Sequence, residues 1–129
     1  MIVSDCSAIL SFLLDPAENE SVGVAVGNAD CLAAPDLIDI ELMSALRRLE
    51  SLRRISTAGA ERVIDDFLLL QLERFPSADL IAAIWSLRKN FSAYDAAYVA
   101  LAQSLKVPLL TRDGRLKRAV TEQTTIVLI

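Results

Sequence analysis

The side chains best suited to chemistry are four acids spread along the chain: Asp5, Glu41, Asp95 and Asp113. They lie 36, 54 and 18 positions apart, so only the fold can bring them together. Four carboxylates in one small space would repel each other and could not all stay ionised unless a cation were bound. Because only oxygen donors are offered, the expected ion is Mg²⁺ or Mn²⁺. Such an ion activates water for attack on a phosphodiester.

The chain contains no histidine at all. This excludes the Ser-His-Asp and Cys-His mechanisms and every site built on paired histidines. If the protein is an enzyme, its proton chemistry must therefore use carboxylates, lysine, tyrosine or metal-bound water. The sequence also lacks Gly-x-Gly-x-x-Gly and Walker A patterns, which excludes the common nucleotide-binding classes.

Short apolar runs alternate with longer segments of helical periodicity, and this pattern predicts an α/β fold with a parallel sheet covered by helices on both faces. The strands are expected at Met1–Asp5, Cys31–Ala34, Val107–Leu110 and Thr125–Leu128. The helices are expected at Ser7–Leu14, Glu18–Asn28, Asp36–Arg54, Thr57–Arg74 (capped by Thr57), Ser77 or Asp79 to Lys89, Ser92–Lys106 and Arg115–Val120. Ligands of such folds bind at the carboxyl ends of the strands, where the four acids are expected to meet.

Each acid also has a purely structural interpretation. Asp5 could cap the first helix, and Asp95 could form a capping box with Ser92. Asp113 precedes a glycine in a strong turn dipeptide. Glu41 could be solvated or paired with Arg48 on its own helix. Taken singly, these interpretations compete well with a metal site, and the case for chemistry rests on the four acids together.

The composition predicts one domain over residues 1–129 that is rich enough in apolar residues, at 53%, to form a core. The longest stretch without a charged residue has ten members, 96–105, and a membrane-spanning helix needs about twenty. The N-terminus does not have the pattern of a secretory signal, and there are only two cysteines, so a cytoplasmic location is expected. Residues 1–46 hold eight acids and no base, whereas residues 47–129 hold nine acids and thirteen bases.

Four segments of the chain, in this order and spacing, resemble the PIN-domain ribonucleases, and within them the VapC-type toxins of bacterial toxin–antitoxin pairs. The segments are MIVSDCSAIL (1–10), APDLIDIELMSALR (34–47), SAYDAAYVALA (92–102) and LLTRDGRL (109–116). The resemblance implies a three-layer α/β/α sandwich with a short central parallel sheet. It also implies a metal-dependent endoribonuclease that forms a homodimer and is inhibited by a cognate antitoxin.

By position, Asp5, Glu41, Asp95 and Asp113 match the acidic quartet of that family, which holds the metal and carries out catalysis. Ser7 and Thr111 match the small hydroxyl residues that support the quartet. The chain departs from the family at Cys6, usually alanine, and at Ser4, where an apolar residue is common. Neither change removes a ligand, although Cys6 could make the site sensitive to thiol reagents.

Three basic residues follow the strand that presents Asp113, and we expect them to contact substrate phosphates: Arg112, Arg115 and Lys117. Tyr94 and Tyr98 fall in a helix that is apolar nearly all round, so both are expected in the core. With few aromatic residues, a base-stacking platform is not evident. A folded RNA recognised by its shape and phosphates is therefore the expected substrate. The resemblance to VapC-type toxins implies transfer RNA or ribosomal RNA.

The two helices predicted over 36–74 carry much apolar surface, part of which could receive an amphipathic antitoxin helix. The residues concerned are Leu46, Leu49, Leu52, Val63, Ile64, Phe67, Leu68 and Leu70. The main alternative to an enzyme is a catalytically silent PIN scaffold that serves only for binding, with the acids acting as helix caps. Loss of RNA cleavage in Asp95→Asn, with the fold and partner binding retained, would separate the two.

Overall fold

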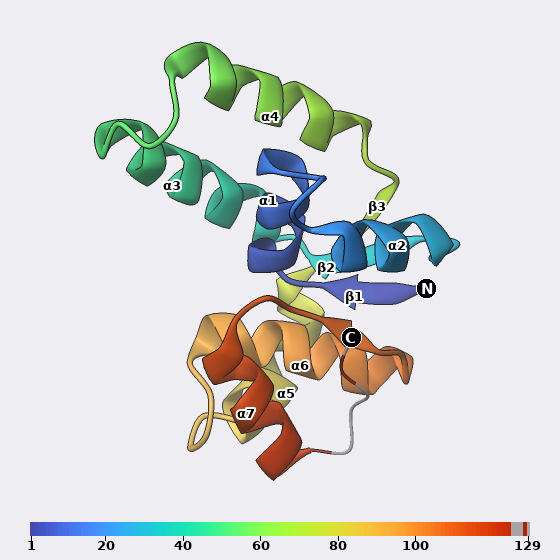
Figure 1. Cartoon of the computed structure of the whole chain (residues 1–129). Helices are drawn as coiled ribbons and strands as arrows, with labels where there is room; N and C mark the ends of the chain where they lie inside the picture. The colour runs from blue at the N-terminus through green and yellow to red at the C-terminus, as the bar shows by residue number, and fades with distance from the viewer. Residues whose placement is uncertain (125–127, 129) are drawn as a thin grey trace.

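The computed structural model describes residues 1–124 and 128 of the chain. Within this part, strands and helices alternate as the sequence predicts (Figure 1). The elements are β1 (Ile2–Ser4), α1 (Cys6–Leu14), α2 (Glu20–Asn28), β2 (Leu32–Pro35), α3 (Ile38–Ser51), α4 (Thr57–Leu69), β3 (Leu72–Phe75), a 3₁₀-helix η1 (Ser77–Leu80), α5 (Ile81–Ser86), α6 (Ala93–Leu105), β4 (Leu109–Leu110) and α7 (Gly114–Gln123).

The strands form a parallel sheet in the order β3-β2-β1-β4. The chain moves outward from β1 through β2 to β3 and then returns to the other side of β1. Since crossovers between parallel strands are right-handed, this reversal sends the helices to opposite faces of the sheet. Figure 1 shows α1 to α4 on one face and α5 to α7 on the other. The predicted three-layer α/β/α sandwich is confirmed.

The core lies on both faces of the short central strands. Val3 of β1, Ala33 of β2 and Leu109 of β4 are completely buried. Helix α6 buries seven consecutive residues, 96–102, which explains why its sequence is apolar nearly all round. Small alanines on this helix let it pack closely against β1 and β2. No helix in the described part of the chain is both long and apolar enough to cross a membrane.

One predicted helix is wrong over its last five residues, 70–74. The helix expected over Thr57–Arg74 ends at Leu69, and β3 follows as an edge strand paired with β2. The leucines at 68–70 continue the helical pattern, but Leu70 takes an extended backbone with φ −65° and ψ 136°. Glu73 and Arg74 are exposed on β3, which is typical of an edge strand. This strand was not predicted because its two charged residues hide the apolar pattern.

Smaller differences concern the ends of elements. Ser56, and not Thr57, caps α4, accepting the backbone N–H of Gly59 at 3.0 Å. The helix predicted to reach Lys89 is instead η1 followed by the short α5, which ends at Ser86. The final strand predicted over 125–128 lies outside the described residues except for Leu128, which makes a parallel bridge with Leu109.

Candidate active site

The four acids lie at the edge of the sheet where its strands end. Asp5 directly follows β1, and Asp113 follows the neighbouring strand β4, which is paired with it through Ser4 and Leu110. The chain leaves β1 into α1 on one face of the sheet and leaves β4 into α7 on the other, so this is the topological switch point at which ligands of such folds bind. Glu41 comes from the first turn of α3, after β2, and Asp95 from the first turn of α6.

Asp5 is held more firmly than the other acids. Its side chain is buried, with the residue only 5% exposed. Oδ1 caps α1 by accepting the backbone N–H of Ala8 at 2.9 Å and also accepts the hydroxyl of Ser7 at 2.7 Å. Oδ2 accepts the hydroxyl of Thr111. The cap and the site therefore use the same carboxylate, and the two interpretations of Asp5 are compatible.

The two hydroxyl residues connect the ends of β1 and β4. Ser7 Oγ accepts the backbone N–H of Arg112 at 2.9 Å while its own proton goes to Asp5. Thr111, completely buried, accepts the backbone N–H of Asp113 at 3.0 Å while its own proton also goes to Asp5. Both hydroxyls therefore fix the turn that carries Asp113 relative to the Asp5 carboxylate.

Glu41 has a partner that the sequence did not suggest. The phenol of Tyr98 donates a hydrogen bond to Oε1 of Glu41 at 2.8 Å. The alternative in which Glu41 pairs with Arg48 is wrong, because no ion pair joins these side chains within the described residues. Glu41 is half-buried, and Oε2 receives no hydrogen bond from the described part of the chain. That oxygen is left with lone pairs for a ligand.

Asp95 and Asp113 both stand in the first turn or at the cap of a helix. Ser92 caps α6 by accepting the backbone N–H of Asp95 at 3.2 Å, as expected from the capping pattern. Asp113 caps α7, and its Oδ1 accepts the backbone N–H groups of Arg115 at 2.8 Å and Leu116 at 3.2 Å. Both acids are partly exposed, so their carboxylates can be reached by solvent or substrate.

The electrostatics of the site reflect its crowding with like charges. Burial, more than any other cause, raises the pKa of Asp5, Glu41 and Asp95 above the ordinary values of these side chains. Neighbouring carboxylates raise them further: the charge of Asp113 acts on the pKa of Asp5 and of Asp95, and the charges of Asp5 and Asp95 act on that of Glu41. Each of the four acids is thus close enough to influence at least one other, which is the arrangement a cation would stabilise.

The acids are not assembled into a closed cage. Among residues 1–124 and 128, no three or more Asp, Glu, Cys or His side chains are arranged to hold a metal ion. Mg²⁺ usually keeps several waters and is bound through one or two carboxylates, so an open set of oxygen donors fits it. Glu41 and Asp95, with exposed oxygens, could bind directly, and Asp5 and Asp113 could bind directly or through water.

The three basic residues predicted to contact phosphates lie beside these acids. Arg112 is exposed at the end of β4, and Arg115 is exposed in the first turn of α7. The guanidinium of Arg115 is 3.9 Å from Oδ2 of Asp113, and its charge lowers the pKa of Asp95. Arg115 and Asp95 also line one small hollow of about 170 Å³. Lys117 lies one turn from Asp113 and is half-buried.

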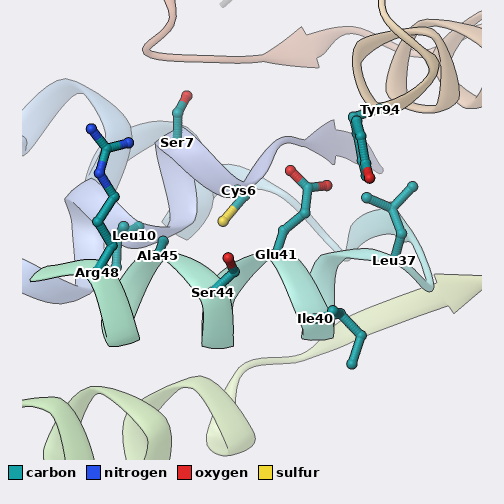
Figure 2. Close-up of a pocket in the computed structure, with 10 residues that line it drawn as sticks. All are labelled: Cys6, Ser7, Leu10, Leu37, Ile40, Glu41, Ser44, Ala45, Arg48 and Tyr94. Carbon is teal, nitrogen blue, oxygen red and sulfur yellow. The ribbon is translucent and has the colours of Figure 1, made fainter. Parts of the chain in front are cut away.

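Cys6 lies beside Glu41 in the wall of the site (Figure 2). Burial, with smaller contributions from the charges of Glu41 and Asp5, raises the pKa of this thiol to about 12. A thiol with this pKa is protonated near neutral pH and is a poor nucleophile. The prediction that Cys6 makes the site sensitive to thiol reagents is therefore not supported by the buried, protonated state of this thiol.

Sequence reasoning placed both tyrosines of α6 in the core, and this is right for only one of them. Tyr98 is 2% exposed, whereas Tyr94, one turn earlier, is 65% exposed. Tyr94 lies in the first turn of α6, which extends beyond the sheet edge, and lines a hollow next to Glu41. The available signal was its place directly before Asp95, since a residue beside a site acid at a helix start is close to the site.

Comparisons with known proteins agree with this geometry. The family model of the PIN domain matches residues 2–121. Ribonuclease VapC9 of Mycobacterium tuberculosis is 38% identical over 129 residues, covering 100% of this chain and 98% of the relative. Ribonuclease VapC1 of the same species is 39% identical over 118 residues, covering 91% and 89%. The chain belongs to the PIN-domain family, and its relatives there are VapC ribonucleases.

Solved structures support the same fold. A protein from Pyrobaculum aerophilum superposes with a TM-score of 0.70 at 22% identity, covering 98% of this chain and 81% of that one. VapBC2 from Rickettsia felis, solved with a DNA fragment from its promoter, gives 0.68 at 15% identity, with 100% and 98% covered. VapC20 of M. tuberculosis, described as a sarcin–ricin loop cleaving toxin, gives 0.65 at 17% identity, with 92% and 95% covered.

Proposed function

We propose that this chain is a metal-dependent endoribonuclease that acts as the toxin of a toxin–antitoxin pair. The observation that carries the proposal is the gathering of Asp5, Glu41, Asp95 and Asp113 at the switch point of the sheet. Burial and the charges of neighbouring carboxylates disfavour the ionised forms of the first three of these acids. These residues would hold Mg²⁺ or Mn²⁺. The ion would supply an activated water and stabilise charge on a phosphoryl oxygen.

The side chains around the acids keep them in place for this role. Thr111 and Ser7 hold the carboxylate of Asp5, and Tyr98 holds one oxygen of Glu41 while leaving the other open. Arg112, Arg115 and Lys117 would neutralise phosphates next to the bond that is cleaved. Since water is the nucleophile, the 2′-hydroxyl of the RNA need not take part.

Cleavage of RNA by an Asp95→Asn variant tests this function directly. With cellular RNA as substrate, we expect the variant to lose cleavage by at least about a hundredfold while the fold, followed by circular dichroism, is unchanged. Asp65→Asn, which changes an exposed acid on α4, is the matched control and should cleave normally. Chelation with EDTA should stop the wild-type reaction, and Mg²⁺ or Mn²⁺ should restore it.

Two results would contradict the proposal in different ways. Cleavage at the wild-type rate with EDTA present would exclude metal-dependent hydrolysis. No cleavage by the wild type under any metal condition, with partner binding intact, would favour the silent binding scaffold instead.

We infer that the RNA is a folded one, transfer RNA or ribosomal RNA, met in the cytoplasm, and that residues 1–129 act as one domain. The description of VapC20 as a toxin that cleaves the sarcin–ricin loop supports a ribosomal target. Mapping the 5′ ends of cellular RNA fragments after induction of the protein would identify the cleavage site.

A cognate antitoxin is the partner we propose, by analogy with VapBC2. Apolar side chains on α3 and α4 remain exposed and could receive it: Ile40 at 73%, Leu52 at 54%, Leu68 at 69% and Leu69 at 84%. Leu46 is only 3% exposed, so Leu46→Glu would disturb the core and is unsuitable for testing the interface. The double variant Ile40→Glu, Leu68→Glu is the better test. If it binds the antitoxin as tightly as the wild type does, the antitoxin does not bind at this surface.

A homodimer is the proposed assembly. Ile81 and Trp85 lie on one face of α5 and are 63% and 67% exposed. Light scattering should give a mass of twice 14.1 kDa for the wild type and a shift toward one chain for Trp85→Ser. A wild-type protein that stays at the mass of one chain would contradict the dimer.

A further inference from the structure

A hollow of about 810 Å³ opens beside Glu41, between α1, α3 and the start of α6. Its volume lies within the range of about 300–1,000 Å³ that is typical of small-ligand sites. Leu10, Leu37 and Ala45 contribute apolar lining, and Ser7 and Ser44 add hydroxyl groups (Figure 2). The catalytic mechanism proposed above uses the Glu41 side of this hollow and leaves the rest of it unexplained.

The two ends of the hollow differ in chemistry. Figure 2 shows Tyr94 and Leu37 at one end, on the side of the Glu41 carboxylate, and Arg48 at the other. Tyr94 is 65% exposed, so a face of its ring is open for stacking. Its hydroxyl makes no hydrogen bond with the described part of the chain. An open aromatic ring beside a site acid suits a flat ligand.

Arg48 supplies an uncommitted positive charge. It is exposed on α3, and its guanidinium forms no ion pair within residues 1–124 and 128. It follows Glu41 by seven positions, or about 10 Å along the helix axis. The hollow therefore offers a stacking surface next to the carboxylates and a cation about two helical turns away.

We propose that this hollow binds one unpaired nucleotide of the RNA, adjacent to the phosphate that is cleaved. The base lies against Tyr94 and Leu37, and a neighbouring phosphate lies at Arg48. The inference rests on the proposed function and narrows its substrate to a single-stranded stretch or loop. A nucleotide inside a duplex has both faces of its base stacked and cannot present one to Tyr94.

The exposed ring of Tyr94 is a stacking surface that is not evident from the sequence, because the sequence predicts both tyrosines of α6 in the core. A protein helix is the competing occupant, because much of the lining is apolar. However, the hollow has an open aromatic ring beside carboxylates at one end and a free cation at the other. This arrangement suits the base and phosphate of a nucleotide better than the apolar face of a helix.

Binding of the four ribonucleoside 5′-monophosphates to the full chain tests the proposal. The titration is followed by amide chemical shifts in EDTA, so that no cleavage takes place. We expect at least one nucleotide to shift amides of the hollow, including those of Ser44, Arg48 and Tyr94. Tyr94→Leu should raise its dissociation constant by about tenfold, and Tyr94→Phe, which keeps the ring, should change it less than about twofold.

Arg48→Gln separates the phosphate contact from the base contact. It should weaken binding of the nucleotide but leave binding of the matching nucleoside unchanged. Arg47→Gln is the matched control, since Arg47 is an exposed neighbour on α3 outside the hollow, and it should not affect either ligand.

The proposal is overturned if the shifts fall elsewhere, or if Tyr94→Leu binds as tightly as the wild type. It is also overturned if no nucleotide shifts these amides while a synthetic apolar helical peptide does, because the hollow would then be a protein-docking site. These results do not depend on metal. If RNA cleavage requires metal but no nucleotide binds in the hollow, this inference is wrong and the proposed function still holds.

Discussion

The phenol of Tyr98 and the carboxylate of Glu41, 57 positions apart, are joined by a hydrogen bond of 2.8 Å. Tyr98 is buried in α6 and Glu41 stands in the first turn of α3, so the bond connects the two helices across the sheet edge. It leaves Oε2 of Glu41 as the oxygen available to a ligand.

Tyr98→Phe should therefore weaken metal binding without unfolding the protein. A hydrogen bond to a charged group contributes about 1.5–3 kcal/mol, so we expect the Mg²⁺ concentration for half-maximal cleavage to rise by about tenfold or more. The measurement is a Mg²⁺ titration of RNA cleavage. Thr121→Val, which removes an exposed hydroxyl on α7, is the control. An unchanged Mg²⁺ requirement would show that Tyr98 has only a packing role.

Thr111→Val should cost both stability and activity. The hydroxyl of Thr111 is completely buried, donates to Asp5 and accepts the backbone N–H of Asp113. Loss of this hydroxyl leaves buried polar groups without a partner. We expect the free energy of unfolding, measured by urea denaturation, to fall by about 2 kcal/mol. Thr111→Ser keeps the hydroxyl and should lose much less. A Thr111→Val variant as stable as the wild type would show that the hydroxyl does not carry this contribution.

The pH dependence of stability follows from the raised pKa values of Asp5, Glu41 and Asp95. A carboxyl whose pKa is higher in the folded than in the unfolded state stabilises the fold at low pH and loses that contribution as the pH rises through the folded value. The measured quantity is the Tm of Asp95→Asn minus the Tm of the wild type, both without metal. This difference should become more positive by about 1–3 °C when the pH is raised from about 4 to about 7.

Mg²⁺ should then raise the wild-type Tm, and most strongly at the higher pH, because it binds the ionised carboxylates. The variant should respond less. Calorimetry in EDTA and in Mg²⁺ gives both values, and a Tm difference that shrinks as the pH rises would contradict the charge crowding of the site.

Arg115→Gln should weaken RNA binding. Its guanidinium is exposed beside Asp113 and faces the hollow that contains Asp95. RNA binding is measured by filter binding in EDTA at several salt concentrations. The slope of the logarithm of the binding constant against the logarithm of the salt concentration should correspond to about one released ion fewer than in the wild type. Arg118→Gln, also exposed on α7, is the control and should change neither value. Equal effects of both substitutions would indicate general attraction to RNA only.

Alkylation should distinguish the two cysteines. The thiol of Cys6 has a pKa raised to about 12, whereas Cys31 is partly exposed at the start of β2. At about pH 8, iodoacetamide should modify Cys31 at least about tenfold faster than Cys6 in the folded protein. Peptide mass spectrometry follows both sites, and urea-unfolded protein is the control, in which the rates should become similar. Faster modification of Cys6 would contradict its burial.

Much of the architecture follows from the sequence because its elements have clear periods. The continuous apolar run of α6 and the apolar strand β2 could hardly be placed elsewhere. Strand β3 could not be recognised, since an edge strand with exposed Glu73 and Arg74 lacks a continuous apolar pattern. Its existence depends on pairing with β2, which is information that the local sequence does not contain.

The meeting of the four acids at one edge of the sheet could be predicted, but the hydrogen-bond partners of these acids could not. Parallel strands end at one edge, and this brings Asp5 and Asp113 together whatever the side chains around them. The bond between Tyr98 and Glu41 depends on the relative rotation of two helices, and the exposure of Tyr94 depends on how far α6 extends past the sheet. Neither quantity can be read from periodicity alone.

Asp5 both caps α1 and is one of the four site acids, and this affects the choice of an inactive variant. Its carboxylate caps the first turn of α1 and accepts the hydroxyl of Thr111 at the end of β4, so replacing it would weaken the contact between these two elements. If a substitution at Asp5 abolished activity, the effect of a destabilised fold could not be distinguished from the effect of the missing carboxylate in the site. An inactive, well-folded version for expression and crystallisation should be sought at Asp95, whose carboxylate is partly exposed, and not at Glu41, which accepts the hydroxyl of buried Tyr98.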